Sequence, residues 1–492
     1  AFLELLEAQE GAEAVAAFHA MSEDEAIDWL FRRNVPFEGT LKEDRHQDVL
    51  ESLRAMQEIQ RHNGEEGCHR YILSNCSGAL DIAVLHAMAL SSGWEGALTV
   101  DLVPLFESIE DLDGAKEEMA RLYAHPVYAA HLDARHSDQT VMLGFSDGTK
   151  DGGYLRANWA IYRAKQNLTE VSRVHGRTVM FFDGRGGPPA RGGGNTHRFY
   201  ASLGRDIENR EIQTTIQGQT ISSNFGIPKS AGFNLELLFT AGVKNRLFDE
   251  EDTQISAADS ALLDELGSTS HGHYLALRNR PEFTDYLATF GTLKYYGATN
   301  IGSRPTSRAK DGAIRFEDLR AIPFVGSWSQ LKQNVPGYYG LGTALEALDR
   351  EGRLEEAAGL YRRNAFFRTL IENSMQSMKK CDFRLTAHLA DHPTFGELWN
   401  TVHEEFERTR VLVLAITGQQ ELMDTVPSIK ESIRLRDSII LPLLVIQQFA
   451  LAEMEKRNSG EEGEASDWTP ELLRKLIIRT MYGIVNASRN AV

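Results

Sequence analysis

The sequence predicts an α/β protein that is predominantly helical. In the first half of the chain, short apolar runs alternate with helical patterns at the spacing typical of parallel β/α units. Several runs lead directly into a carboxylate or a glycine-rich loop, as the strands of a (β/α)8 barrel do at the end that carries the active site. From about residue 230 onward the pattern is almost wholly helical. We therefore expect part of a TIM-type barrel, surrounded by many helices.

The expected strands are short apolar runs bounded by turn residues. They are Tyr71–Asn75, Ala97–Glu107, Thr140–Asp147, Val179–Phe182 and Glu211–Ile216. Helical patterns lie between them, for example over Asp111–Ala124. Near the start of the chain, Ser22 followed by Glu25 predicts a capping box at the beginning of a helix.

The composition excludes several classes of protein. The 492 residues are 42% hydrophobic, enough for a large core, and the net charge of −18 argues against nucleic acid and anionic membranes as partners. Cys68, Cys76 and Cys381 show neither metal-site spacing nor a disulfide framework, as in a reduced cytoplasmic protein. The most apolar run, Ile439–Ile446, contains a proline and is too short to span a bilayer. Because the sequence begins inside a helical pattern, we expect a piece of a longer protein.

The segment after Val179–Phe182 is the most distinctive of the chain. It begins at Asp183 and places Arg185 and Arg191 among two prolines and a series of glycines. Glycine lets the main chain approach a ligand closely, proline stiffens the loop, and arginine presents forked donors suited to phosphate or carboxylate oxygens. We predict an anion-binding loop, with His197 as a structural residue beside it. An RGG-type nucleic-acid tail is the weaker alternative, because such tails are repetitive and have no apolar strand before them.

Glu107 and Asp147 end consecutive apolar runs. A single acid after a strand is usually a turn residue or a helix cap, but recurrence at successive strand ends favours a shared site. Two carboxylates at the mouth of a barrel would suit Mg²⁺ or Mn²⁺, which take few protein ligands and complete their shell with substrate oxygens. Lys150 and Asp151 would add a cation and a further acid at the same level.

Further cations lie on the long loop 302–320, which contains Arg304 and Arg320. With the loop arginines and the two carboxylates, they predict a metal and several guanidinium groups around a small, highly anionic substrate, the electrostatic arrangement of phosphoryl transfer. We expect residues 1–230 to carry the barrel strands with the metal- and phosphate-binding loops. Residues 231–492 should form a mostly helical layer that includes the basic loop, and the acidic segment 458–470 should be a disordered excursion.

Two of these segments resemble the signature regions of phosphoenolpyruvate carboxylase: VMLGFSDGTKDGG and DGRGGPPARGGGNTH. Further motifs match that family in the same order, namely VPLFESIEDL, NIGSRPTSR, DLRAIPF, LGTAL, VLAITG, ESIRLRD and the terminal SRN. The similarity covers nearly the whole chain and corresponds to roughly the C-terminal half of a complete family member. Agreement of many motifs in order is far more specific than any one of them.

The resemblance implies roles for individual residues. The implied ligands of Mg²⁺ or Mn²⁺ are Glu107 and Asp147. The implied residues around phosphoenolpyruvate are Lys150, Arg185, Arg304 and Arg320, and the expected catalytic residues are Lys150, Arg185 and Asp183. The implied site of inhibition by aspartate or malate comprises Arg191, Lys380, Arg436 and Asn490.

The resemblance also implies a reaction, anaplerotic carbon fixation. Phosphate passes from phosphoenolpyruvate to bicarbonate, which gives carboxyphosphate and a metal-stabilised enolate. Carboxyphosphate then yields CO2, which the enolate attacks to form oxaloacetate. Family members are cytoplasmic homotetramers, and we expect neither nucleic acid nor membrane as a partner.

The chain departs from the family pattern at several positions. Most members have histidine where this chain has Asp183, and a carboxylate there would oppose an anionic substrate unless it is protonated, paired with an arginine or bound to metal. Glutamate is expected at Gln219, and a basic residue is missing near Ser222–Asn224. Two alternatives therefore stay open: a divergent phosphatase that dephosphorylates phosphoenolpyruvate without carboxylation, and a non-catalytic metabolite-binding paralogue.

Overall fold

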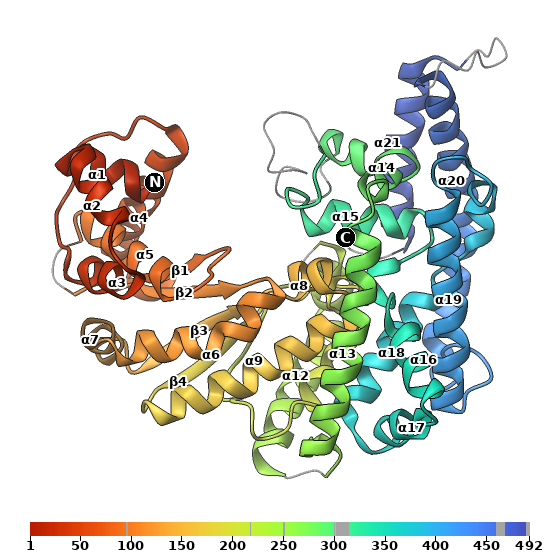
Figure 1. Ribbon diagram of the computed structural model, residues 1–492, viewed down its shortest axis with the longest axis horizontal. Helices are drawn as coiled ribbons and strands as arrows, with labels where there is room; N and C mark the ends of the chain where they lie inside the picture. The colour runs from red at the N-terminus through yellow and green to blue at the C-terminus, as the bar shows by residue number, and fades with distance from the viewer. Residues whose placement is uncertain are drawn as a thin grey trace. The chain divides into compact units, whose positions relative to one another are not determined.

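The computed structural model describes residues 1–94, 97–216, 218–248, 251–299, 301, 314–458 and 468–488. It is a predominantly helical α/β protein with a parallel sheet (Figure 1). The chain forms two compact units. The first comprises Ala1–Gly144, Tyr162–Asp183 and Asp206–Gln213, and the second comprises Phe145–Ile161, Gly184–Arg205 and Thr214–Val492. The chain thus passes between the two units several times.

The parallel sheet follows the order of the sequence. Its strands are β1 (Arg70–Leu73), β2 (Asp101–Phe106), β3 (Asp138–Leu143), β4 (Thr178–Asp183) and β5 (Ile212–Thr214). The pairs β1–β2, β2–β3 and β3–β4 are all parallel. Phe106 at the end of β2 is level with Leu143, and Leu143 is level with Asp183 at the end of β4. The carboxyl ends of these three strands therefore lie at one edge of the sheet.

Apolar side chains explain why these runs form strands. Leu102, Val103, Val141, Leu143 and Val179 are all buried, as expected for a parallel sheet covered on both faces. The five predicted runs are thereby confirmed as strands, with shifted ends.

One predicted strand end was wrong. The run expected to end on Asp147 stops at Leu143, and Asp147 lies in the first turn of helix α8 (Phe145–Gly152). A carboxylate there complements the positive end of the helix dipole, which favours the helical start over a longer strand. Strand β4 is longer than predicted at its carboxyl end, because it extends one residue beyond Phe182 and includes Asp183.

The helices before α8 lie in the first unit. They are α1 (Phe2–Glu10), α2 (Ala12–His19), α3 (Glu23–Arg32), α4 (Asp44–Asn63), α5 (Ala79–Ser91), α6 (Ile109–Ala124) and α7 (Pro126–Ala134). The predicted capping box is confirmed: the Glu25 N–H donates to Ser22 Oγ, and the Glu25 carboxylate accepts from the Ser22 N–H. Ser108 and Asp111 form a second box at the start of α6, so this helix begins before the expected residue.

The remaining helices follow α8. They are α9 (Tyr154–Val174), α10 (Thr196–Ala201), α11 (Gln219–Phe225), α12 (Pro228–Leu247), α13 (Ala257–Arg278), α14 (Phe283–Thr289), α15 (Ala321–Gln330), α16 (Leu341–Arg350), α17 (Leu354–Arg363), α18 (Ala365–Lys379), α19 (Gly396–Thr417), α20 (Pro427–Asn458) and α21 (Pro470–Ser488). After β5 ends at Thr214, the described part of the chain contains helices and no strand, as predicted from about residue 230 onward. The acidic segment expected to be disordered falls mostly outside the described residues.

Helix α20 contains the most apolar run of the sequence. Among the described residues, it is the one helix long and apolar enough to cross a membrane by length and composition. It lies beside α21 (Figure 1), and its Gln447 Nε2 donates to Gln330 Oε1 at 2.8 Å inside the protein. A buried amide paired with a neighbouring helix is typical of a core helix.

Two buried histidines in the first unit predict sensitivity to acid. His86 Nδ1 and His131 Nε2 have no hydrogen-bond partner among the described residues. Burial lowers the pKa of His86 to about 4 and that of His131 to about 3. An unfolded histidine binds its proton near pH 6.5, so stability falls as pH drops below that value, by about 2 kcal/mol per histidine at pH 5.

Thermal unfolding between pH 7.5 and pH 5 measures this effect. We expect the melting temperature to fall with pH, and the double variant His86→Leu with His131→Leu to flatten the dependence. His19→Gln, which alters an exposed histidine on α2, should leave it unchanged. A melting temperature that is equal at both pH values would contradict the prediction.

Candidate functional site

The glycine-rich segment after β4 forms a compact loop that is closed by its own main chain. The Gly193 N–H donates to Pro188 O at 3.0 Å, and the Gly194 N–H donates to Gly187 O at 3.0 Å. A Cβ on Gly193 would lie 2.3 Å from the carbonyl oxygens of Gly186 and Gly187, which leaves no room for a side chain. The predicted irregular loop is confirmed, and its glycines are required by this close main-chain approach.

Arg185 is buried at the start of this loop, with 4% of its surface exposed. Its guanidinium carbon lies 4.3 Å from the centroid of the Phe199 ring and 5.5 Å from that of Phe145. Among the described residues, its Nε and Nη2 have no hydrogen-bond partner. Buried N–H groups of a cation are costly to leave unpaired, so an anionic ligand that accepted from them would be bound strongly.

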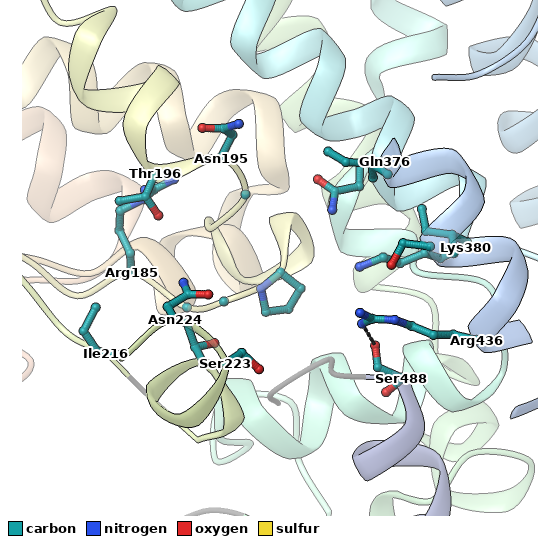
Figure 2. A pocket seen from close by; sticks show the side chains of 18 of the residues that line it. Arg185, Asn195, Thr196, Ile216, Ser223, Asn224, Gln376, Lys380, Arg436 and Ser488 are labelled. Carbon is teal, nitrogen blue, oxygen red and sulfur yellow. Dashed lines mark hydrogen bonds between the residues drawn. The ribbon is translucent and has the colours of Figure 1, made fainter. Parts of the chain in front are cut away.

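A cavity of about 660 Å³ lies within the second unit (Figure 2). Arg185 lies on one side of the view, and Lys380 and Arg436 lie together on the other. Ser223 and Asn224 of α11 also line the cavity, at the place where the expected basic residue is missing. The structure thus brings a predicted substrate-binding arginine and two predicted effector residues to one cavity.

Lys380 and Arg436 form the cationic side of this cavity. Lys380 directly follows α18, and Arg436 of α20 donates from Nη1 to Ser488 O at 3.0 Å. Burial, reinforced by the charges of Lys332 and Arg436, lowers the pKa of Lys380 to about 8. A cation with a pKa so lowered binds an anion more readily at neutral than at alkaline pH.

Lys332 is a member of this cavity that sequence reasoning missed. Its Nζ lies 2.7 Å from Asp437 Oδ1, and the side chain is almost wholly buried. Lys332 has φ 55° and Asn334, which also lines the cavity, has φ 41°. Non-glycine residues hold this left-handed conformation at a cost of about 1–3 kcal/mol, and only where the surroundings impose it. No motif marks Lys332, so no signal in the sequence could have found it.

Arg191 does not line this cavity. It is buried in the short turn Pro189–Arg191, and its Nε donates to Ser146 Oγ at 3.0 Å. Burial lowers its pKa to about 10, although nearby Asp147 acts against this shift. The role of Arg191 at an effector site stays a prediction. Asn490, the fourth residue of that set, lies outside the described residues.

Glu107, one of the two predicted metal ligands, directly follows β2. Its Oε1 accepts the Asn75 N–H at 2.9 Å, and Gly144 packs so closely that a Cβ there would lie 3.0 Å from Glu107 Cα. Glu107 belongs to the first unit, whereas Asp147 of α8 belongs to the second. Both side chains are partly exposed.

No group of three or more His, Cys, Asp or Glu side chains within the described ranges is arranged to hold a metal. The assignment of Glu107 and Asp147 as the ligands of one cation therefore stays a prediction from the resemblance. The donors, hard carboxylate oxygens that solvent reaches, fit Mg²⁺ or Mn²⁺.

Lys150 lies in the last turn of α8. Its Nζ stands 4.6 Å from the centroid of the Phe316 ring, and the Arg278 guanidinium lies 4.9 Å from the same ring. Phe316 belongs to the described end of the basic loop, which leads to Arg320 at the N-cap of α15. The structure thus joins Lys150 to the segment that carries Arg320. Arg304 lies outside the described residues.

His197 was expected to be structural. It lies in α10 and lines the cavity, and partial burial together with the charges of Arg198 and Lys244 lowers its pKa. A neutral imidazole at this wall is compatible with that expectation and with a ligand contact.

Asp183 has a partner of a kind that sequence reasoning missed. Lys165 Nζ lies 2.8 Å from Asp183 Oδ1 and 3.0 Å from Oδ2, and the two side chains are 2% and 1% exposed. The charge is thus compensated by a lysine of α9, whereas the sequence suggested an arginine, a proton or a metal. Its catalytic role stays a prediction.

Comparisons with known proteins agree with the resemblance seen in the sequence. The family model for phosphoenolpyruvate carboxylase matches residues 4–491. The phosphoenolpyruvate carboxylase of Corynebacterium diphtheriae is 37% identical over 407 residues, which are 80% of this chain and 44% of that protein. The enzyme of Nocardia farcinica is 35% identical over 89% of this chain and 48% of its own length.

The phosphoenolpyruvate carboxylase of Corynebacterium glutamicum is 32% identical over 99% of this chain and 54% of its own length. The chain therefore spans about half the length of the curated relatives it matches. A family model that matches nearly every residue decides the relationship, and the chain belongs to the phosphoenolpyruvate carboxylase family.

Proposed function

We propose that the polypeptide to which this chain belongs is a carboxy-lyase that converts phosphoenolpyruvate and bicarbonate to oxaloacetate and phosphate. The observation that carries the proposal is Arg185, a buried arginine with unpaired N–H groups that lines the cavity from the family's glycine-rich loop. Membership of the family and the names of the relatives support the same reaction.

The remaining residues supply binding and orientation. Arg185 would donate hydrogen bonds from its guanidinium fork to phosphate oxygens, and Lys150, with Arg304 and Arg320 of the basic loop, would add positive charge around the substrate. Glu107 and Asp147 would hold Mg²⁺ or Mn²⁺, which when bound acts as a Lewis acid on substrate oxygens.

In the proposed reaction, a bicarbonate oxygen bonds to phosphorus as the bond from phosphorus to the enol oxygen breaks. Carboxyphosphate then loses phosphate, and the methylene carbon of the enolate bonds to the released CO2. Fixed cations that face the transferring phosphoryl group would stabilise the charge that develops on its oxygens.

We further propose that the sheet is part of a (β/α)8 barrel whose other strands come from sequence outside this chain. Six large apolar side chains of α11, α12 and the turn between them are more than half exposed, namely Ile221, Ile227, Phe233, Leu235, Phe239 and Leu247. Such exposure is unusual for a complete domain and would be relieved by further chain packed on these helices. Homotetramer formation and a cytoplasmic location are proposed from the family resemblance.

Product analysis tests the proposed function. The polypeptide as the gene encodes it should form oxaloacetate only when phosphoenolpyruvate, bicarbonate and Mg²⁺ or Mn²⁺ are all present. The 492-residue chain alone should show no turnover, because part of the barrel would be missing. Pyruvate as the only product would indicate the divergent phosphatase, and failure to bind phosphoenolpyruvate would indicate a non-catalytic protein. Robust turnover by the 492-residue chain would contradict the proposed barrel.

The cationic side of the cavity is proposed as an inhibitory site for aspartate or malate. Lys380 and Arg436 lie together and would each take one carboxylate of such a ligand. Removing one charged hydrogen bond should lower the binding affinity of the ligand by about 10- to 100-fold. Lys380→Ala should therefore raise the inhibition constant of aspartate by that factor.

The pH dependence of this inhibition should follow the protonation of Lys380. Its pKa is lowered to about 8, so the side chain is charged below that pH and neutral above it. Inhibition by aspartate should therefore weaken between pH 7 and pH 9, and Lys380→Arg should remove the dependence because arginine stays charged. Equal inhibition constants for the wild type and Lys380→Ala would refute the assignment.

A further inference from the structure

The pleat of β4 decides which way Asp183 faces. Successive side chains of a strand point to opposite faces, so Asp183 shares its face with Phe181. Both contact Lys165 of α9: the ammonium pairs with the carboxylate, and Nζ lies 4.4 Å from the centroid of the Phe181 ring. Asp183 therefore points toward helix α9.

The β3 residues level with Phe181 and Asp183 are apolar. In the parallel register, Phe181 is level with Val141 and Asp183 is level with Leu143, and both β3 residues are fully buried. A carboxylate in such a layer loses its hydration, and this loss is offset only by a well-placed partner. The bidentate contact of Lys165 provides that partner.

Asp183 also marks the point where the glycine-rich loop begins. It is the last residue of β4, and only Gly184 separates it from Arg185. Its side chain is held on α9 while its main chain is held level with Leu143 of β3. The direction in which the chain leaves β4 is thereby fixed from two sides.

We propose that Lys165 and Asp183 are a positioning pair, which fixes the exit of the loop 184–194 from β4 and so places the Arg185 guanidinium for phosphate binding. This proposal rests on the proposed function in one respect, that Arg185 binds phosphoenolpyruvate. It assigns a role to Lys165 and makes Asp183 a positioning residue instead of the catalytic residue expected from the sequence.

Removing the charges singly and together tests the proposal in the polypeptide as encoded. The variants are Lys165→Met, Asp183→Leu and the double variant, and the measurements are melting temperature, kcat, KM and calorimetric affinity for phosphoenolpyruvate at 15 °C. Lys116→Met is the matched control, because Lys116 pairs at 2.7 Å with Glu170 on the exposed side of the same helix α9. The control should shift the melting temperature by less than about 2 °C.

Each single variant removes one partner of a buried ion pair, so it should lower the melting temperature by roughly 5–10 °C. Because Arg185 would then be misplaced, the KM and Kd for phosphoenolpyruvate should rise at least about tenfold while the protein is still folded. The double variant replaces the pair with apolar groups of similar size, so it should regain the wild-type melting temperature. Its KM and kcat should each lie within about threefold of the wild-type values.

Two results would overturn the proposal. A double variant with a restored melting temperature but a kcat still reduced by about 100-fold would show that Asp183 takes part in the chemistry. Single variants with a wild-type Kd would show that the pair does not place Arg185. If the wild type binds phosphoenolpyruvate without forming oxaloacetate, the proposed function fails, and the Kd series still decides the role of the pair.

Discussion

Arg185→Ala is expected to lower kcat/KM for phosphoenolpyruvate by about 10³-fold or more in the polypeptide as encoded, the range found when an arginine that stabilises a transferring phosphoryl group is removed. The physical reason is that Arg185 is buried and its Nε and Nη2 have no hydrogen-bond partner among the described residues. These N–H groups can therefore donate to a bound ligand. Calorimetric titration with phosphoenolpyruvate should show that binding is lost together with turnover.

Two further variants separate the role of charge from that of geometry. Arg185→Lys keeps a cation but removes the fork, so we expect an intermediate loss of about 10²-fold. Arg198→Ala is the matched control, because Arg198 lies on α10 near the same loop, is half exposed and pairs with Glu372. It should change kcat/KM less than about threefold. An Arg185→Ala protein that binds phosphoenolpyruvate as the wild type does would exclude Arg185 as the phosphate ligand.

Asp147→Asn is expected to reduce kcat by about 10³-fold and to raise the Mn²⁺ concentration needed for half-maximal activity by at least about tenfold. A neutral amide is a much weaker ligand for a hard divalent cation than a carboxylate is. Asp147 lies in the first turn of α8, where the substitution keeps the shape of the side chain and removes only its charge.

Asp349→Asn provides the control for this change of charge, because Asp349 is exposed near the end of α16. It should leave both the metal requirement and kcat unaltered. Unchanged turnover in Asp147→Asn would show that Asp147 holds no catalytic metal and would contradict the proposed metal site.

The sequence predicted the structural features that depend on residues close together in the chain. The apolar runs of β2, β3 and β4 form strands because their side chains are buried on both faces, and the Ser22–Glu25 pair caps a helix through contacts within one turn. The glycine-rich loop is likewise a local structure, closed by hydrogen bonds between its own main-chain groups. The place of Asp147 was missed because a helix start competes with strand extension over only three residues.

The sequence could not predict contacts that depend on how distant elements pack. Lys165 lies on a helix ahead of β4 and carries no motif, so its pairing with Asp183 becomes visible only when α9 covers the strand. The shared cavity of Arg185 and Lys380 depends in the same way on the packing of α18 and α20 near the loop. The family resemblance named Arg185 as a substrate residue and Lys380 as an effector residue without showing that one cavity holds both.

Isotope transfer from bicarbonate tests the central claim most directly. The polypeptide as encoded is incubated with phosphoenolpyruvate, Mg²⁺ and bicarbonate labelled with ¹⁸O, and the phosphate and oxaloacetate are analysed by mass spectrometry. If a bicarbonate oxygen attacks phosphorus, the phosphate should carry one labelled oxygen, and the new carboxyl group of oxaloacetate should carry two. Unlabelled phosphate formed together with pyruvate would show that water is the nucleophile and would contradict the carboxylase assignment.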